Sequence, residues 1–127
     1  RILVMYGDLV FNEETMSNLK LEQSCIIIDE SGMMGKEEVG CNIYDGVIEQ
    51  LVPDMPNKWG QISFFIDKEL DWLKKISWDR NKGHYFGFEA INEIIDKGGS
   101  FNAVSPTGSK ITDVDSSKDL IVARKII

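Results

Sequence analysis

The sequence predicts an α/β fold in which helices flank a mixed, mainly parallel sheet. Two observations support this prediction. Short apolar runs alternate along the chain with segments whose apolar residues have helical spacing, which is the pattern of an α/β domain. Several of the runs are apolar at every position, as is typical of strands buried on both faces of a parallel sheet. With 127 residues, the chain is long enough for one domain with a single core.

The predicted strands lie mainly in the first half of the chain. They are expected at residues 2–5, 25–28, 39–44, 47–51 and 61–66. The first two are continuous apolar runs, so we expect both to be buried. The third and fourth flank Asp45-Gly46, a two-residue turn that strongly indicates a β-hairpin. A weakly helical segment is expected from Asn12 towards Leu21, and a surface loop at residues 31–38.

Helices and short strands alternate in the second half. Helices are expected around residues 70–76, 88–95 and 116–127, and short strands at 101–104 and 109–114. Gly98-Gly99 is a stop signal for the second of these helices. Ser116 is a suitable N-cap for the last helix, because an acid, Asp119, follows three residues later. The inner face of that helix is expected to consist of Leu120, Ala123 and Ile127.

Composition excludes several classes of protein. The net charge of −7 argues against binding to a nucleic-acid backbone, although Mg²⁺ offsets such a charge towards a nucleotide. The chain lacks the roughly 20 consecutive apolar residues of a membrane span. Cys25 and Cys41 share no metal-ligand spacing and are expected to be buried, reduced thiols. We therefore expect a soluble, cytoplasmic protein that binds neither nucleic acid nor membrane.

Acidic residues at strand ends are the candidates for chemistry, because ligands of open α/β sheets bind beyond the carboxyl ends of the strands. Asp8 follows Gly7 at the end of the first apolar run and is placed to bind a hard cation such as Mg²⁺; alternatively, it caps a turn. Asp113 and Asp115 point to one face of an extended segment. A metal ion would relieve their repulsion, whereas exposed surface charge is the simpler interpretation.

The order of these pieces resembles the C-terminal portion of nucleotidyltransferases with the sugar-nucleotide pyrophosphorylase fold, which is Rossmann-like. The similarity is closest to the phosphocholine cytidylyltransferase branch, whose members have an acid-x-Asp-x-x-x-Asp-Leu ending before the last helix. The matching pieces are the strand with Gly7-Asp8, the hairpin, Lys58-Trp59-Gly60-Gln61-Ile62, Phe88-Glu89-Ala90-Ile91-Asn92 and the stretch from Asp113 to Leu120 with Ala123.

The resemblance implies roles for six residues. Asp8 and Asp115 match the catalytic aspartates that bind Mg²⁺, and Asp113 matches the acid beside them. Glu89 falls in the segment that lines the acceptor pocket and contacts a cationic group there. Lys58 and Trp59 fall near the acceptor, although Trp59 is slightly better explained as a partly buried aromatic. Trp59, Tyr85 and Phe86 are candidates for an aromatic wall around a quaternary ammonium; the alternative is that they belong to the core.

The implied reaction is Mg²⁺-dependent transfer of a nucleotidyl group from a nucleoside triphosphate, with release of pyrophosphate. CTP is the favoured donor, and the acceptor is a phosphorylated small molecule such as phosphocholine, a phosphonate or a sugar phosphate. Two alternatives within the fold are a sugar-1-phosphate nucleotidyltransferase and a molybdopterin nucleotidyltransferase. An alternative of another class is a non-catalytic α/β binding or regulatory module, in which the acids are surface charge.

One part of the family pattern is not found. The family's Gly-rich loop with a basic residue, which cradles the triphosphate, has no counterpart here, and the sequence opens on Arg1 within an apolar run. We therefore expect residues 1–127 to be the C-terminal, metal- and acceptor-binding portion of a single nucleotidyltransferase domain whose N-terminal half is missing. Alone, this portion is expected to be inactive.

Overall fold

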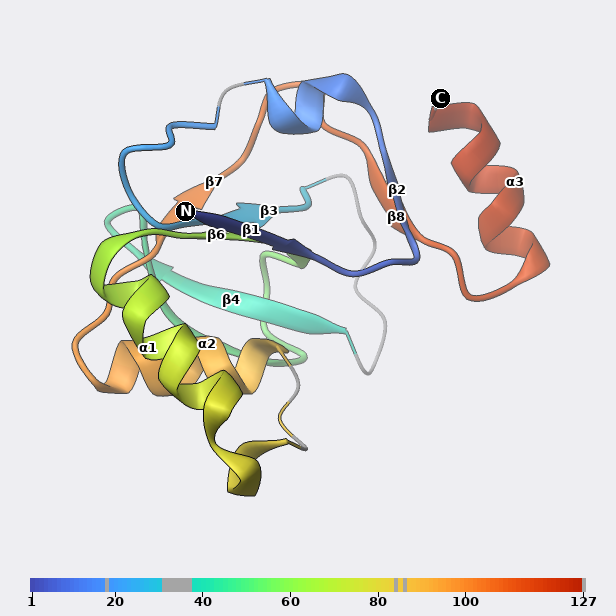
Figure 1. Cartoon of the computed structure of the whole chain (residues 1–127). Helices are drawn as coiled ribbons and strands as arrows, with labels where there is room; N and C mark the ends of the chain where they lie inside the picture. The colour runs from blue at the N-terminus through green and yellow to red at the C-terminus, as the bar shows by residue number, and fades with distance from the viewer. Residues whose placement is uncertain (18, 31–37, 84, 86, 127) are drawn as a thin grey trace.

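The chain folds into a six-stranded sheet with two helices on one face and a two-stranded ribbon on the other (Figure 1). The computed structural model describes residues 1–17, 19–30, 38–83, 85 and 87–126. Its strands are β1 (Ile2–Met5), β2 (Leu9–Phe11), β3 (Cys25–Ile28), β4 (Val39–Tyr44), β5 (Val47–Pro53), β6 (Trp59–Phe65), β7 (Asn102–Val104) and β8 (Ile111–Asp113). Its helices are α1 (Asp67–Trp78), α2 (Gly87–Asp96) and α3 (Ser117–Ile126), with short 3₁₀ turns η1 (Glu13–Met16) and η2 (Arg80–Lys82).

The mixed α/β class is confirmed, but the sheet is only partly parallel. Its strand order is β1-β6-β3-β7-β5-β4. Among the described residues, the β3–β7 pair is parallel and the other four pairs of neighbours are antiparallel. The expectation of a mainly parallel sheet was wrong for two reasons. Strand β6 lies between β1 and β3 in the opposite direction, and a two-residue turn joins β4 to β5, which only antiparallel strands allow.

The predicted hairpin is confirmed, with Asp45 and Gly46 at its turn. Their φ angles are 52° and 77°, which is the type I′ geometry that matches the twist of the flanking strands. The weakly helical segment after Asn12 proved to be the single turn η1. Strand β2, which precedes it, was not predicted, because three residues are too few for a periodic signal. Of the predicted loop, residues 31–37 lie outside the described residues.

Strand β1 is present as predicted, but the prediction that it is buried was wrong. It ends the sheet, and its four side chains are 38–40% exposed. An apolar run predicts a strand that is able to be buried on both faces. Whether it is buried depends on its neighbours, and among the described strands β1 pairs only with β6.

The two faces of the sheet carry separate apolar clusters. Ile26 and Ile28 face α1 and α2, whereas Ile27 between them faces the opposite side. There it packs with Ile62 and Ile111 beneath the ribbon formed by β2 and β8. This alternation follows from the period of two of a strand. The run at residues 25–28 is apolar throughout because both of its faces are covered.

Both cysteines are free and buried, as the sequence predicted. Burial raises the pKa of the Cys25 thiol to about 11 and that of Cys41 to about 12. Both side chains therefore stay protonated at neutral pH and act as small apolar groups in the core.

The last helix begins at the predicted cap. Asp119 donates its N–H to Ser116 Oγ at 3.4 Å, and its carboxylate accepts from the Asp115 N–H at 2.9 Å. The expected inner face is only partly correct: Ala123 is 2% exposed, but Leu120 is 45% exposed, and Ile127 lies outside the described residues. Among the helices described, none has the length and hydropathy that crossing a membrane requires.

Asn92 joins helix α2 to strand β5. Its side-chain amide donates to Leu51 O at 2.7 Å and accepts from Leu51 N at 2.8 Å. The side chain thus satisfies both backbone groups of a fully buried strand residue, as a neighbouring strand would.

We expect Asn92→Ala to lower the free energy of unfolding by roughly 1–3 kcal/mol, because it leaves the two Leu51 backbone groups without partners. Urea denaturation measures the loss. Asn42→Ala is the matched control, since Asn42 is exposed and its one side-chain contact, with Glu49 at 3.3 Å, lies in solvent. Equal stabilities of the two variants would contradict this role of Asn92.

Candidate metal and acceptor site

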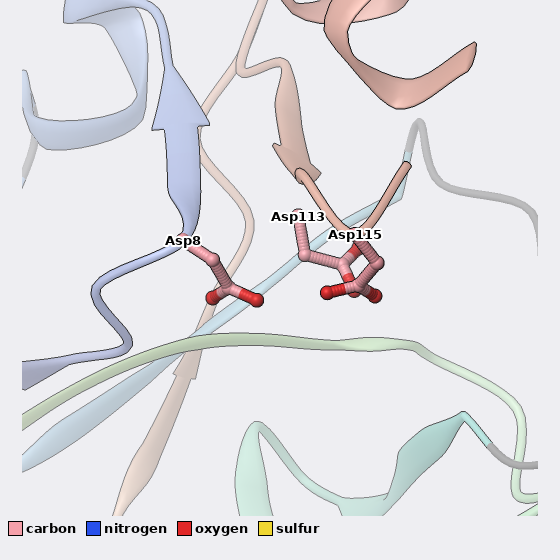
Figure 2. Close-up of side chains that lie close together, drawn as sticks. All are labelled: Asp8, Asp113 and Asp115. Atoms are coloured by element: carbon pink, nitrogen blue, oxygen red, sulfur yellow. The ribbon is translucent and has the colours of Figure 1, made fainter. Parts of the chain in front are cut away.

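Three aspartates meet beyond one end of the β2–β8 ribbon. Asp8 precedes β2, Asp113 ends β8, and Asp115 follows two residues later (Figure 2). One carboxylate oxygen from each lies within 4.8 Å of the others. Asp113 is half-buried, and Asp8 and Asp115 are exposed. The structure therefore brings together the three acids for which the sequence predicts a metal site.

The register of the ribbon places Asp8 beside Asp113. Leu9 pairs directly with Asp113, and the ladder continues one step further because the Val114 N–H donates to Asp8 O at 2.8 Å. The N-cap of α3 fixes the third acid, since the backbone of Asp115 donates to the side chain of Asp119. Backbone contacts thus hold the loops that carry the three carboxylates.

The carboxylates affect one another's charge. The pKa of Asp115 is raised, first by a hydrogen bond with Asp113 and by the charge of Asp113, and then by a hydrogen bond with Asp8. Like charges at this distance favour retention of a proton. A divalent cation relieves the same repulsion, and carboxylate oxygens are the ligands that Mg²⁺ prefers. The donor set therefore fits Mg²⁺.

Lys58 adds a positive charge beside the acids. Its ammonium lies 4.0 Å from Asp113 Oδ1 and 3.7 Å from Glu38 Oε1. The side chain is only 10% exposed, so Lys58 is held more firmly than a surface lysine. It stands immediately before β6, where its carbonyl accepts from the Asp29 N–H at 2.8 Å. The structure thus places Lys58 at the acid cluster.

Trp59 and Glu89 are not members of the carboxylate cluster, although Trp59 lines a small crevice together with Lys58 and Asp113. Trp59 is 5% exposed in the core and donates through Nε1 to Ser63 Oγ at 3.4 Å. This placement agrees with the interpretation of Trp59 as a packed aromatic. Glu89 is half-buried in the first turn of α2. Its charge contributes to a raised pKa of Tyr85, after the larger effects of burial and of Glu93. Phe86, the third residue of the expected aromatic wall, lies outside the described residues.

Two residues with contacts at helix α2 were not found by sequence reasoning. Tyr6 accepts a hydrogen bond from the Gly87 N–H at 3.3 Å, at the start of α2. Glu93 binds the Lys82 ammonium at 2.6 Å through Oε1, and its other oxygen is buried without a hydrogen bond from the described residues. No spacing in the sequence marks either residue, because their partners lie far away along the chain or belong to an irregular turn.

A pocket of about 640 Å³ lies away from the acid cluster. Its polar lining includes Lys20, Glu22, Asp45 and Asn102, and Cys25 also lines it. None of the six residues singled out from the sequence lines this pocket, and its charges of both signs do not converge on one kind of ligand. We therefore place the candidate site at the acids.

Comparison with known proteins bears on the fold. No protein-family model and no curated protein sequence matches the chain. Among solved structures, it is similar to a protein of Bacillus anthracis assigned as a glucose-1-phosphate thymidylyltransferase, with a TM-score of 0.69 and 17% identity over 97% of this chain and 52% of that one. The chain has the fold of the sugar-phosphate nucleotidyltransferases. The resemblance inferred from the sequence is confirmed at this level.

Two further solved nucleotidyltransferases share the fold. The inositol-1-phosphate CTP transferase of T. maritima has a TM-score of 0.64 and 13% identity, over 98% of this chain and 54% of that one. A nucleoside-diphosphate-sugar pyrophosphorylase of Vibrio cholerae RC9 has a TM-score of 0.57 and 13% identity, over 97% and 55%. The chain spans about half the length of the structures it matches. At these identities the likeness establishes the fold and leaves the activity to be argued from the site.

The raised pKa of Asp115 gives a testable pH dependence. A carboxyl whose folded pKa exceeds its unfolded value favours folding while it is protonated, and this contribution is lost as pH rises through the folded pKa. Without metal, we expect Asp115→Asn to melt at a higher temperature than the wild type at pH 7. The difference should disappear below the ordinary carboxyl pKa of about 3.9. Melting temperatures in EDTA across this pH range measure it.

Adding Mg²⁺ supplies the complementary test. We expect it to raise the melting temperature of the wild type at pH 7 and to leave Asp115→Asn unchanged, since binding to the folded state alone stabilises it. As the pH falls through the raised pKa of Asp115, this increase should shrink. An equal response of the two proteins to Mg²⁺ would exclude Asp115 as a ligand.

Proposed function

We propose that the protein containing this chain transfers a nucleotidyl group from a nucleoside triphosphate to a phosphorylated small molecule, with release of pyrophosphate. The observation that carries the proposal is the convergence of Asp8, Asp113 and Asp115 at the edge of a nucleotidyltransferase fold. Residues 1–127 would form the metal- and acceptor-binding portion. The triphosphate loop would be supplied by residues outside this chain, in keeping with its span of about half the matched structures.

In this proposal Asp8 and Asp115 hold Mg²⁺, and Asp113 completes the acidic site and faces Lys58. Bound Mg²⁺ supplies neutralisation of charge on the phosphate oxygens. An oxygen of the acceptor phosphate forms the new bond to the α-phosphorus, and the bond from that phosphorus to the β-phosphate oxygen breaks as pyrophosphate leaves. Lys58 attracts the incoming phosphate by its charge. Catalysis then rests on positioning and electrostatics, without a covalent protein intermediate.

The donor and acceptor classes follow from separate arguments. The ending from Asp113 to Leu120 favours CTP, and the T. maritima structure is that of an enzyme described as using CTP. Phosphocholine or a phosphonate is supported by Glu89 in the first turn of α2, beside the half-buried ring of Tyr85. Sugar or inositol phosphates are the alternative acceptors, which the matched structures favour by their descriptions.

The decisive experiment pairs each nucleoside triphosphate with phosphocholine, aminoethylphosphonate and sugar phosphates, using the full-length protein. Pyrophosphate release is followed with Mg²⁺ and with EDTA. We expect release with at least one pair, CTP being the favoured donor, and its loss in EDTA. If no pair releases pyrophosphate, the proposal fails and a non-catalytic binding module becomes the better description.

We expect Asp8→Asn to lower kcat/KM by about 100-fold or more, because it removes a group that holds the charge-neutralising ion. Asp71→Asn is the matched control, since Asp71 is an exposed acid on α1 and is not a member of the cluster. If both variants lose activity equally, or neither does, Asp8 has no special role.

Substitution of Lys58 is expected to affect metal binding and turnover differently. Lys58→Met removes a cation 4.0 Å from Asp113, so we expect it to bind Mg²⁺ at least as tightly as the wild type. Turnover should nevertheless fall by roughly 10- to 100-fold, which is the worth of a charged contact to phosphate. Mg²⁺ titration and pyrophosphate release measure the two quantities, and full activity of the variant would contradict this role.

A further inference from the structure

Tyr6 connects the segment that carries Asp8 with the start of helix α2. Its hydroxyl accepts the Gly87 N–H at 3.3 Å, and Gly87 is the first residue of the helix. Its ring packs edge-to-face on Trp59, with centroids 5.6 Å apart and planes at 76°. Two residues after Tyr6 comes Asp8, and directly before Trp59 comes Lys58. The Tyr6 side chain therefore contacts both the segment that carries Lys58 and the helix that carries Glu89, and it lies two residues before Asp8.

The start of α2 is seated closely on this aromatic pair. A Cβ atom added to Gly87 would lie 3.2 Å from the Tyr6 hydroxyl oxygen and 3.4 Å from the Trp59 ring. The first of these distances is tighter than most real Cβ contacts, so a side chain at residue 87 would require the Tyr6 side chain or the helix start to shift by a few tenths of an ångström. The absence of a side chain at Gly87 allows the helix to approach this far.

The hydrogen bond from the Gly87 N–H to the Tyr6 hydroxyl restricts how α2 can move over the aromatic pair. The first N–H groups of a helix have no acceptor within the helix, and the Tyr6 hydroxyl supplies one for Gly87. An aromatic contact alone allows the helix to slide over the ring, whereas a hydrogen bond weakens steeply when its geometry changes. Glu89 follows two residues later in the same turn, so its position depends on where Gly87 is held.

We propose that Tyr6 is a positioning residue that fixes the first turn of α2, with Glu89, relative to the metal-binding Asp8. The inference rests on the proposed function, in which Asp8 holds Mg²⁺ and Glu89 faces the acceptor. Tyr6 itself needs no contact with the reacting groups. Tyr6 instead sets the distance between Asp8 and Glu89. A small misplacement of either group would lower the rate of the reaction.

Tyr6→Phe tests this directly, because it keeps the ring and removes only the hydroxyl. Tyr44→Phe is the matched control, since Tyr44 is 74% exposed on β4. In the full-length protein, we expect Tyr6→Phe to lower kcat/KM for the acceptor by roughly two- to tenfold, the worth of one neutral hydrogen bond. The KM for the triphosphate should stay unchanged. A lower melting temperature with unchanged kinetics would show a merely structural role and overturn the proposal.

A second measurement does not depend on activity. In NMR spectra of the full-length protein titrated with Mg²⁺, we expect the backbone amides of Gly87 and Glu89 to shift together with those of Leu9 and Val114. In Tyr6→Phe the amide signals of Gly87 and Glu89 should not shift, whereas those of Leu9 and Val114 should. Tyr44→Phe should behave like the wild type. If the shifts in the wild type are confined to Leu9 and Val114, the positioning role of Tyr6 is overturned, whereas the metal site is supported. If no amide shifts, the metal site fails, and this inference with it.

Discussion

The pairing of β2 with β8 is the contact on which the candidate site depends. The two strands are separated by almost the whole chain, and each has three residues. Their register sets Leu9 opposite Asp113, and the bond from Val114 to the Asp8 carbonyl extends the ladder to the acids themselves. A slip by one residue would turn every side chain of one strand to the other face. The apolar cluster of Ile27, Ile62 and Ile111 beneath the ribbon opposes such a slip.

The site combines strong local repulsion with a nearby counter-charge. Three carboxylates within 4.8 Å are tolerated because two of them are exposed and because Lys58 stands beside the third. Lys58 is largely buried, so its charge is screened less than that of a surface lysine. The arrangement is open towards solvent on the Asp8 and Asp115 side. Such an arrangement suits the cation and the anionic ligand of the proposed function.

Most elements could be predicted from the sequence, because apolar periodicity, the Asp45-Gly46 turn and the cap at Ser116 are local signals. Strand direction could not, since β6 lies between β1 and β3 through contacts that no local pattern records. The three acids were predicted from their positions at strand ends. Their proximity to Lys58 and the contact of Tyr6 with Gly87 depend on the packing of β6 and α2, which only the folded chain reveals.

Strand β1 has a consequence for how the chain behaves in solution. Ile2, Leu3, Val4 and Met5 are each more than a third exposed, and among the described strands only β6 pairs with them (Figure 1). An apolar strand at the rim of a sheet offers a row of backbone donors and acceptors to any other extended polypeptide. Neither a proline nor a charged residue interrupts these four positions. We therefore expect aggregation of the isolated chain to begin at β1. Its colloidal stability would then depend on whether another polypeptide segment covers this strand.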